Sequence, residues 1–108
     1  MPLLVVELAF GDQPFRLEGI DAPELCQPHG LQAREALERQ VLRRRVHVSG
    51  EHYDDHGRLL GRVRLRGADV GDQLVRQGHA WSYRFRNDRG PYAAQERAAR
   101  QARRGLWS

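Results

Sequence analysis

Apolar and polar residues alternate at the start of the chain, with an apolar side chain at every second position. A period of two is typical of a strand that buries one face. The turn residues Gly11 and Asp12 follow, and residues 15–20 are predicted to form the returning strand of a hairpin. Pro23 interrupts the alternation, because proline disfavours helical angles in the residue before it, and a loop to Gly30 is expected. The alternating apolar positions are Leu4, Val6, Leu8 and Phe10.

From Leu31 the apolar residues change to a helical spacing, which predicts a first helix with a charged outer face. Two more strands are predicted, one at Val46 and Val48 and one over residues 60–65. A polar segment with a turn at His56-Gly57 joins them into a second hairpin. The apolar face of the predicted helix consists of Ala33, Ala36, Leu37 and Val41.

The last third of the chain predicts two helices and one short strand. Asp69 is a suitable N-cap for a short helix that closes at Gly78, and residues 80–83 follow as a strand. Pro91 is well placed to begin a final helix, which Gly105 ends. The predicted order is therefore β-β-loop-α-β-β-α-β-α. The face of the final helix expected to be apolar carries Ala94, Ala98 and Ala102.

This order is compatible with a mixed α+β fold, mainly β: a five-stranded OB-fold Greek-key barrel with three helices. Five strands require the first long hairpin to bend and contribute two of them. The length of 108 residues predicts a single domain over 1–108. The single cysteine excludes an intramolecular disulfide framework. No apolar run is long enough for a membrane helix, and without a signal peptide or a long apolar surface stripe we expect a cytoplasmic monomer, or a secreted protein if the N-terminus is truncated.

The charge of the chain favours an anionic partner. Eighteen positive residues, all arginine, oppose 14 negative ones and give a net charge of +4. Arginine forms bidentate contacts with phosphate, although genomic base composition explains an all-arginine inventory equally well. The basic C-terminal third would attract a polyanion without sequence preference.

Two segments carry residues suited to phosphate chemistry. In the first, Arg16 lies near a strand end and is followed by Asp21 and Glu24, which together suit a phosphate clamp, a metal ligand and a base. A surface strand ending in an acidic turn is the alternative. In the second, Arg58 follows a tight glycine turn and is fixed by the strand after it, where it would meet the charge of a reacting phosphate. A polar hairpin tip with Asp54 and His56 is the alternative there.

Together and in this order, the segments resemble the staphylococcal-nuclease-like domains, also called thermonucleases. The resemblance runs from about Val5 to the C-terminus, and its motifs are specific in combination. They are the run from Arg16 to Glu24, Asp54-x-His-Gly-Arg58, residues 74–81 and the closing residues 105–108. The resemblance implies an OB barrel and a calcium-dependent phosphodiesterase that hydrolyses DNA and RNA by water attack on phosphorus.

The resemblance also assigns roles to individual residues. It implies that Asp21 binds Ca²⁺ beside the backbone carbonyl of Ala22, and that Glu24 is the general base or positions the water. Arg16 and Arg58 would grip the phosphate and stabilise the transition state. General chemistry agrees, since a hard cation polarises a phosphoryl group and guanidinium groups neutralise the charge that spreads over its oxygens.

The chain departs from the family pattern on its first strand. Family members usually carry an Asp-Gly-Asp-Thr-like segment whose second aspartate binds calcium, and that position falls at Leu4. The calcium affinity should therefore be reduced, with Glu18 the nearest spare carboxylate. Three interpretations follow: a weak or metal-altered nuclease, a catalytically inactive single-stranded nucleic-acid-binding module, or a shortened chain.

Two other groups of residues attract attention. Aromatic and arginine residues interleave after the last predicted strand, where they could stack a base beside a phosphate, and His56 could contact a phosphate as well. These residues are Tyr83, Arg84, Phe85 and Arg86, whereas Trp81 and Trp107 are expected to pack in the core and against the C-terminal tail. Zinc ligand spacing is also present, although without a second cysteine we favour surface histidines and a small buried cysteine. The four zinc candidates are Cys26, His29, His52 and His56.

Overall fold

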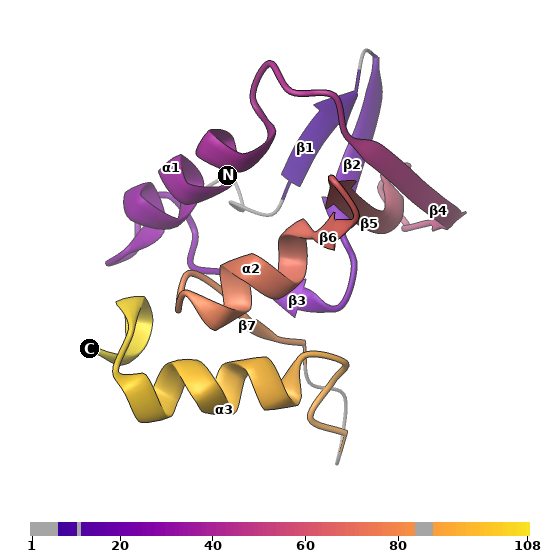
Figure 1. Cartoon of the computed structure of the whole chain (residues 1–108). Helices are drawn as coiled ribbons and strands as arrows, with labels where there is room; N and C mark the ends of the chain where they lie inside the picture. The colour runs from indigo at the N-terminus through magenta and orange to yellow at the C-terminus, as the bar shows by residue number, and fades with distance from the viewer. Residues whose placement is uncertain (1–6, 11, 84–87) are drawn as a thin grey trace.

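The computed structural model describes residues 7–10, 12–83 and 88–108 and combines β-sheets with three α-helices (Figure 1). The larger sheet has the spatial order β1-β2-β5-β4, with β6 paired to the C-terminal end of β5. Strands β2 and β5 run parallel, and every other pair in this sheet is antiparallel. Its strands are β1 (Glu7–Phe10), β2 (Gln13–Leu17), β4 (His47–Tyr53), β5 (Leu59–Leu65) and β6 (Ala68–Asp69).

A second, two-stranded sheet pairs β3 (Ile20–Asp21) with β7 (Trp81–Ser82). Helix α2 contacts β5, α1 and α3, and so occupies the middle of the molecule (Figure 1). The helices are α1 (Gly30–Val41), α2 (Val70–Arg76) and α3 (Ala93–Ala102), followed by the 3-10 turn η1 (Gly105–Trp107). Among the described residues no helix is long and apolar enough to cross a membrane.

The core forms where the predicted periodicities place apolar side chains. On β2, Phe15 and Leu17 are buried while the intervening Arg16 turns to the other face, as a strand of period two requires. On α1 the predicted face is confirmed, since Ala33, Ala36 and Leu37 are buried. The remaining large, fully buried apolar residues are Ile20, Val63, Val70 and Val75.

The expected strand over residues 15–20 is split in two. Strand β2 ends at Leu17, the backbone turns through Gly19 at φ 81°, and β3 begins at Ile20. The mixed α+β fold with three helices is confirmed. Among the described strand pairs, however, β1 and β4 remain the two edges of the larger sheet, so these pairs do not close a barrel. The expected strand positions at Leu4 and Val6 lie outside the described residues.

The prediction for α2 is confirmed. The Asp69 carboxylate accepts hydrogen bonds from the N–H groups of Gly71 and Asp72, at 2.8 and 3.4 Å, which is the N-cap that the sequence indicated. The same carboxylate accepts a hydrogen bond from the Tyr92 hydroxyl at 2.6 Å and so ties α2 to the start of α3. Burial, followed by the Asp69 carboxylate, raises the pKa of Tyr92, which therefore remains a donor.

The predicted apolar face of α3 is wrong. Ala94 and Ala102 are exposed, and the buried residues of the helix are Ala99 and Glu96. Burial of a carboxylate is tolerated because the Ser82 N–H donates to Glu96 Oε1 at 3.0 Å and Arg100 Nε donates to Oε2 at 3.1 Å.

Three single residues also differ from expectation. Trp81 and Trp107 are only half-buried, so neither belongs to the fully buried core. Cys26 is exposed rather than buried.

Candidate functional site

Two arginines, one on β2 and one at the turn that leads into β5, project to the same side of the larger sheet. In the parallel pairing of β2 with β5, Arg16 lies opposite Leu60, so their side chains share one face. Arg58 precedes Leu60 by two positions and therefore points the same way, away from the core face that carries Phe15. Between them lies a cleft of about 360 Å³. Its lining consists of Arg16, Glu18, Gly19, Asp54, Arg58, Leu60 and Tyr83.

Arg58 is held in place by the turn that precedes it. Asp54 Oδ1 accepts hydrogen bonds from the backbone N–H groups of His56 and Arg58, both at 2.9 Å. Asp54 Oδ2 accepts a hydrogen bond from Arg58 Nε at 2.6 Å. Gly57 makes this turn at φ 78°, a left-handed conformation that favours glycine. The turn thus fixes the Arg58 guanidinium group at the cleft.

The same contacts set the ionisation of Asp54. Partial desolvation opposes the charged form, but hydrogen bonds from Arg58 and from the His56 backbone outweigh it, so the pKa of Asp54 lies below its ordinary value. The carboxylate therefore stays ionised and retains Arg58 at every pH near neutrality.

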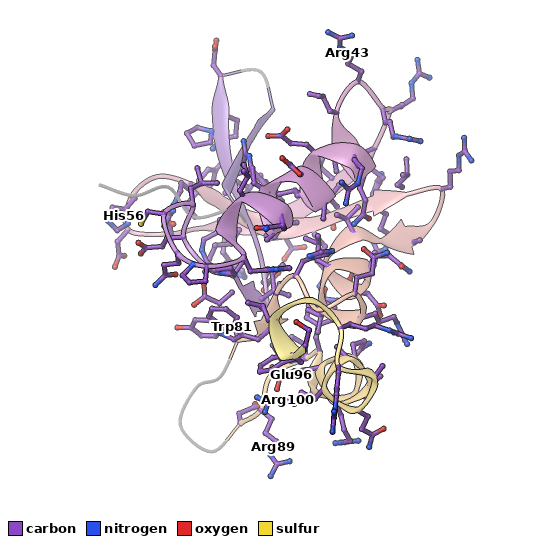
Figure 2. The ribbon with its side chains drawn as sticks, turned by 90° about the vertical axis from the view of Figure 1, so that its left-hand side faces the viewer. Arg43, His56, Trp81, Arg89, Glu96 and Arg100 are labelled. Carbon is purple, nitrogen blue, oxygen red and sulfur yellow. The ribbon has the colours of Figure 1, made fainter. Side chains whose placement is uncertain are left out.

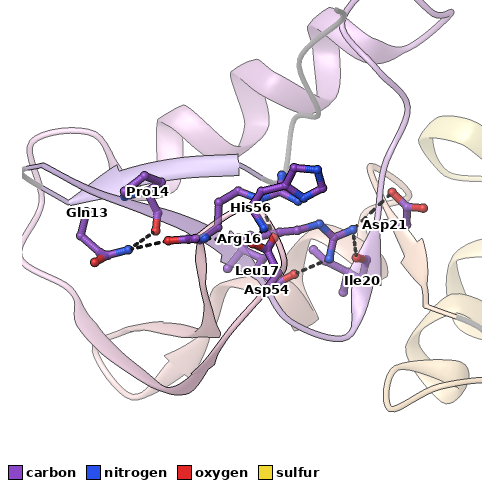
Figure 3. A network of polar contacts seen from close by, with 10 residues as sticks. Gln13, Pro14, Arg16, Leu17, Ile20, Asp21, Asp54 and His56 are labelled. Carbon is purple, nitrogen blue, oxygen red and sulfur yellow. Dashed lines mark hydrogen bonds and ion pairs between the residues drawn. The ribbon is translucent and has the colours of Figure 1, made fainter.

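Arg16 reaches from β2 towards the end of β3. Its Nη1 and Nη2 make long contacts of 3.5 Å with the carbonyl oxygens of Leu17 and Ile20, and Nη2 lies 3.8 Å from Asp21 Oδ1 (Figure 3). The Arg16 side chain is 15% exposed, so it is desolvated on most sides but open to the cleft. A guanidinium group in such a position attracts an anion more strongly than one in bulk water.

Tyr83 closes the cleft from the side of the second sheet. Its N–H donates to the carbonyl of Gly19 at 2.9 Å, which places this exposed aromatic ring beside the two arginines. Of the aromatic and basic residues predicted to contact nucleic acid, Tyr83 is the one brought to the cleft. His56 is exposed at the adjoining turn, and Arg84, Phe85 and Arg86 lie outside the described residues.

Sequence reasoning underrated Glu18 and Asp54. The sequence singles out Glu18 only as a spare carboxylate, whereas the structure places it in the cleft lining with Arg16. The signal for this is its spacing of two from Arg16, which puts both residues on the same face of the sheet. The sequence predicts Asp54 as a residue of a polar turn. The signal for its further role is that an aspartate often accepts a hydrogen bond from the backbone N–H two residues later, here that of His56.

The predicted metal ligands stand at the edge of this site. Asp21 is about one-third exposed, and its Oδ1 accepts a hydrogen bond from the N–H of the buried Ala22 at 2.9 Å. Within the described part of the chain, no group of three or more histidine, cysteine, aspartate or glutamate residues is arranged to hold a metal ion. Calcium takes six to eight oxygen ligands, so Asp21 and the Ala22 carbonyl do not by themselves fit a resident calcium ion.

Glu24 lies on the loop between β3 and α1 and is not among the described residues that line the cleft. Its N–H donates to Gln27 Oε1 at 2.7 Å, and its carbonyl accepts from the Gln27 N–H at 2.9 Å. The carbonyl also packs against Gly30, where a Cβ atom would lie only 2.1 Å from it. The start of α1 therefore fixes the backbone that carries Glu24.

A pair of histidines anchors the end of the same loop. His29 Nε2 and His79 Nδ1 lie 2.9 Å apart, and the two rings are stacked at a centroid distance of 5.1 Å. Burial, followed by the nearby His29 and Arg39, lowers the pKa of His79. The pair joins the loop to the turn between α2 and β7.

Comparison with known proteins identifies the family of the chain. Residues 14–108 match the family model described as staphylococcal nuclease homologue. The chain is 37% identical over 93 residues to the probable staphylococcal-like nuclease CAN2 of Oryza sativa subsp. japonica. The aligned segment covers 86% of this chain and 25% of that protein. It is 37% identical over 94 residues to an uncharacterized endonuclease of Escherichia coli O157:H7, covering 86% and 61% of the two chains.

A third relative, Protein ParB of Escherichia coli, is 37% identical over 116 aligned positions, covering 95% of this chain and 66% of that protein. The chain thus spans about a quarter of the length of the rice relative and about two thirds of the bacterial ones. The family match extends over nearly the whole sequence, and the chain belongs to the staphylococcal nuclease homologue family.

Proposed function

We propose that the protein hydrolyses phosphodiester bonds of DNA or RNA in the cleft between Arg16 and Arg58. The observation that carries this proposal is the convergence of two arginines, one from β2 and one from the turn before β5, each held by a carboxylate, on one concave site. Such groups need little reorganisation when a phosphate enters, and they stabilise the charge that develops on its oxygens. The nuclease names of the relatives support the same reaction.

The family resemblance assigns the base to Glu24, which lies on the loop after Asp21 and outside the cleft lining. In the proposed reaction a water molecule loses a proton to Glu24 while its oxygen forms a bond to phosphorus. The P–O bond to the leaving nucleotide breaks, and the leaving oxygen takes a proton from solvent. Arg16 and Arg58 hold the two non-bridging oxygens, and Tyr83 stacks on the neighbouring base. His56 and the segment with Arg84, Phe85 and Arg86 are proposed to extend the contact with the same strand.

The proposal is tested by incubating purified protein with single-stranded and plasmid DNA, with calcium or with a chelator. We expect cutting by the wild type and a loss of about 100- to 10,000-fold in Glu24→Gln, the range that a general base contributes. Glu51→Gln is the matched control, because it removes an exposed carboxylate of β4 that does not line the cleft, and it should cut as the wild type does. Equal activity of wild type and Glu24→Gln would assign the base to another residue.

Calcium dependence belongs to the same proposal, with Asp21 and the Ala22 carbonyl as ligands. Because the described residues do not complete a cation site, we expect weak binding, with half-saturation near millimolar concentrations, on the order of 10⁻³ M. Calcium titration of the cutting rate and of intrinsic fluorescence measures this constant. Half-saturation in the micromolar range would mean that further ligands complete the site.

The incomplete ligand set also favours a second candidate, a single-stranded nucleic-acid-binding module that does not cut. The same assay separates the two functions. Salt-sensitive binding of DNA without cleavage at any calcium concentration would establish the binding module.

We retain two expectations from sequence as proposals. The first is a monomer that acts on nucleic acid in the cytoplasm. The second is the five-stranded OB-fold Greek-key barrel.

A further inference from the structure

A second hollow, of about 280 Å³, lies against α3 and is lined mainly by arginines. Arg89, Arg97 and Arg100 surround it together with Ala93 and Glu96. Figure 2 shows Arg89 and Arg100 beside Glu96, at the opposite end of the molecule from Arg43. Three guanidinium groups against one carboxylate leave the hollow positively charged, which suits a phosphate group.

The Glu96 carboxylate in this hollow positions the Arg100 guanidinium group more than it repels an anion. Glu96 is only 6% exposed, and its oxygens accept hydrogen bonds from the Ser82 N–H and from Arg100 Nε. The guanidinium carbon of Arg100 also lies 4.0 Å from the centre of the Trp107 ring. A guanidinium group that is both hydrogen-bonded and stacked loses little freedom when it binds an anion.

The other two arginines carry charge that the described structure does not neutralise. Arg89 and Arg97 are exposed, and among the described residues neither forms an ion pair. Arg97 and Arg100 are three positions apart on α3, a spacing at which like charges repel. A bound anion would relieve this repulsion.

The hollow adjoins the cleft across the end of β7. Ser82 donates its N–H to Glu96 in the hollow, and the next residue, Tyr83, lines the cleft. The Ser82 hydroxyl in turn accepts the N–H of Tyr92 at 3.0 Å, so the segment between the two sites is anchored. The cleft and the α3 hollow are therefore linked through two adjacent residues, Ser82 and Tyr83.

We propose that the α3 hollow binds a second backbone phosphate of the same single strand whose first phosphate lies between Arg16 and Arg58. The inference rests on the proposed function for its ligand. Arg89 and Arg97 supply the exposed charge, and Arg100 supplies the prepositioned guanidinium group. The hollow binds phosphate without base specificity and contributes nothing to the bond-breaking step.

Binding in the presence of chelator tests this inference without cleavage. The probes are fluorescently labelled oligothymidylates, a dinucleotide that reaches the cleft alone and a strand of about 12 nucleotides, within the site size of OB-type domains. The test variant is Arg89→Gln/Arg97→Gln, which changes exposed side chains and leaves Arg100 and Glu96 intact. The matched control is Arg43→Gln/Arg45→Gln, with the same loss of charge on another exposed segment.

We expect the test variant to bind the longer strand about fivefold more weakly at roughly 0.1 M salt and to reduce the salt slope by about 0.7, the effect of one lost phosphate contact. Its affinity for the dinucleotide should equal that of the wild type, and the control should bind both probes as the wild type does. Equal losses in test and control variants, or equal losses for both probes, would overturn the inference. So would unchanged binding of the longer strand by the test variant.

The outcome is independent of the nuclease test. A wild type that does not cut, combined with a length-dependent loss in Arg89→Gln/Arg97→Gln, refutes hydrolysis and supports the hollow. A wild type that cuts, combined with unchanged binding by this variant, supports hydrolysis and refutes the hollow. Thermal melting of each variant verifies that it is folded.

Discussion

Asp54 fixes the position of Arg58 in the cleft and does not contact the substrate in the proposed reaction. One of its oxygens bonds the turn and the other bonds the Arg58 side chain, so a single carboxylate sets both the backbone and the guanidinium group. The ion pair is worth more for the position it imposes than for stability, since surface pairs contribute little to folding.

We therefore predict that Asp54→Asn lowers kcat/KM for DNA cleavage by on the order of 10- to 100-fold, because Arg58 is no longer fixed. Steady-state kinetics on a short labelled strand measures the change. Glu38→Gln is the control, since it removes another ion pair between residues four positions apart, the pair of Glu38 with Arg34 on α1. Comparable losses in both variants would show that overall charge, rather than the turn, is responsible.

Asp54 also makes a prediction for acid stability. A carboxyl whose pKa is lower in the folded protein stabilises the fold above the pKa of the unfolded chain, about 3.9, and this contribution is lost as the pH falls through the folded value. Urea unfolding should therefore separate wild type from Asp54→Asn at pH 7 and no longer separate them near pH 2. A constant difference across this range would contradict the shift.

At this scale the sequence predicted much of the site. Arg16, Arg58 and Tyr83 line one cleft, because period-two spacing and a short turn fix where side chains point, while their roles stay predictions. The place of Glu24 outside the cleft lining could not be predicted in the same way, because a loop has no repeating geometry.

At the scale of elements, α1 and the loop before it form one unit. Gly30 is the first residue of α1, and a Cβ atom there would lie 2.1 Å from the backbone oxygen of Glu24. Backbone atoms cannot move aside as a flexible side chain can. The close approach therefore makes the helix start and the Glu24 loop interdependent.

We predict that Gly30→Ala destabilises the protein by about 1–3 kcal/mol, the usual cost of overpacking, and lowers cleavage activity. Helix propensity alone predicts the opposite sign, a gain of roughly 1 kcal/mol. Chemical denaturation and the cleavage assay measure the two effects. Gly67→Ala is the control, because Gly67 has space around it and does not line the cleft. This variant should be destabilised only by the strain of an alanine at positive φ, and its cleavage activity should be unchanged.

The two element-level errors have separate causes. The strand expected over 15–20 is broken at Gly19, where the chain leaves one sheet and enters another, and Ile20 falls outside the period of two set by Phe15 and Leu17. The face of α3 was misjudged because alanine spacing favoured Ala94 and Ala102, while hydrogen bonds from Ser82 and Arg100 allow Glu96 to be buried. The Ser82 partner belongs to another element and leaves no local pattern, whereas Arg100 lies four residues from Glu96 on the same helix.

At the scale of the whole molecule, the His29–His79 contact joins the Glu24 loop to the turn after α2. A histidine with a lowered pKa takes up its proton more readily in the unfolded chain than in the folded one. Its contribution to stability is therefore complete above the unfolded pKa of about 6.5 and declines as the pH falls through the folded value.

We predict that the free energy of unfolding of the wild type decreases between about pH 7 and pH 5, and that His79→Phe removes most of this dependence. Denaturation curves across this range measure it, and the window lies above the one assigned to Asp54. His52→Phe provides the control, since His52 is exposed on β4. A pH dependence that persists unchanged in His79→Phe would place the titrating group elsewhere.

The arrangement of the sheets was the least predictable feature. Three helices and a mixed fold follow from periodicity, but which strands pair is decided by contacts between distant segments, such as the parallel pairing of β2 with β5.

That parallel pairing ties the appearance of the site to the final steps of folding. Arg16 and Arg58 come together only after the chain has closed the long connection that contains α1 and β4, and closing such a connection is entropically costly and slow. Intermediates that have formed only their local hairpins and helices lack the cleft. Recovery of phosphate binding after dilution from denaturant will therefore follow the slowest kinetic phase and lag behind the recovery of helical signal.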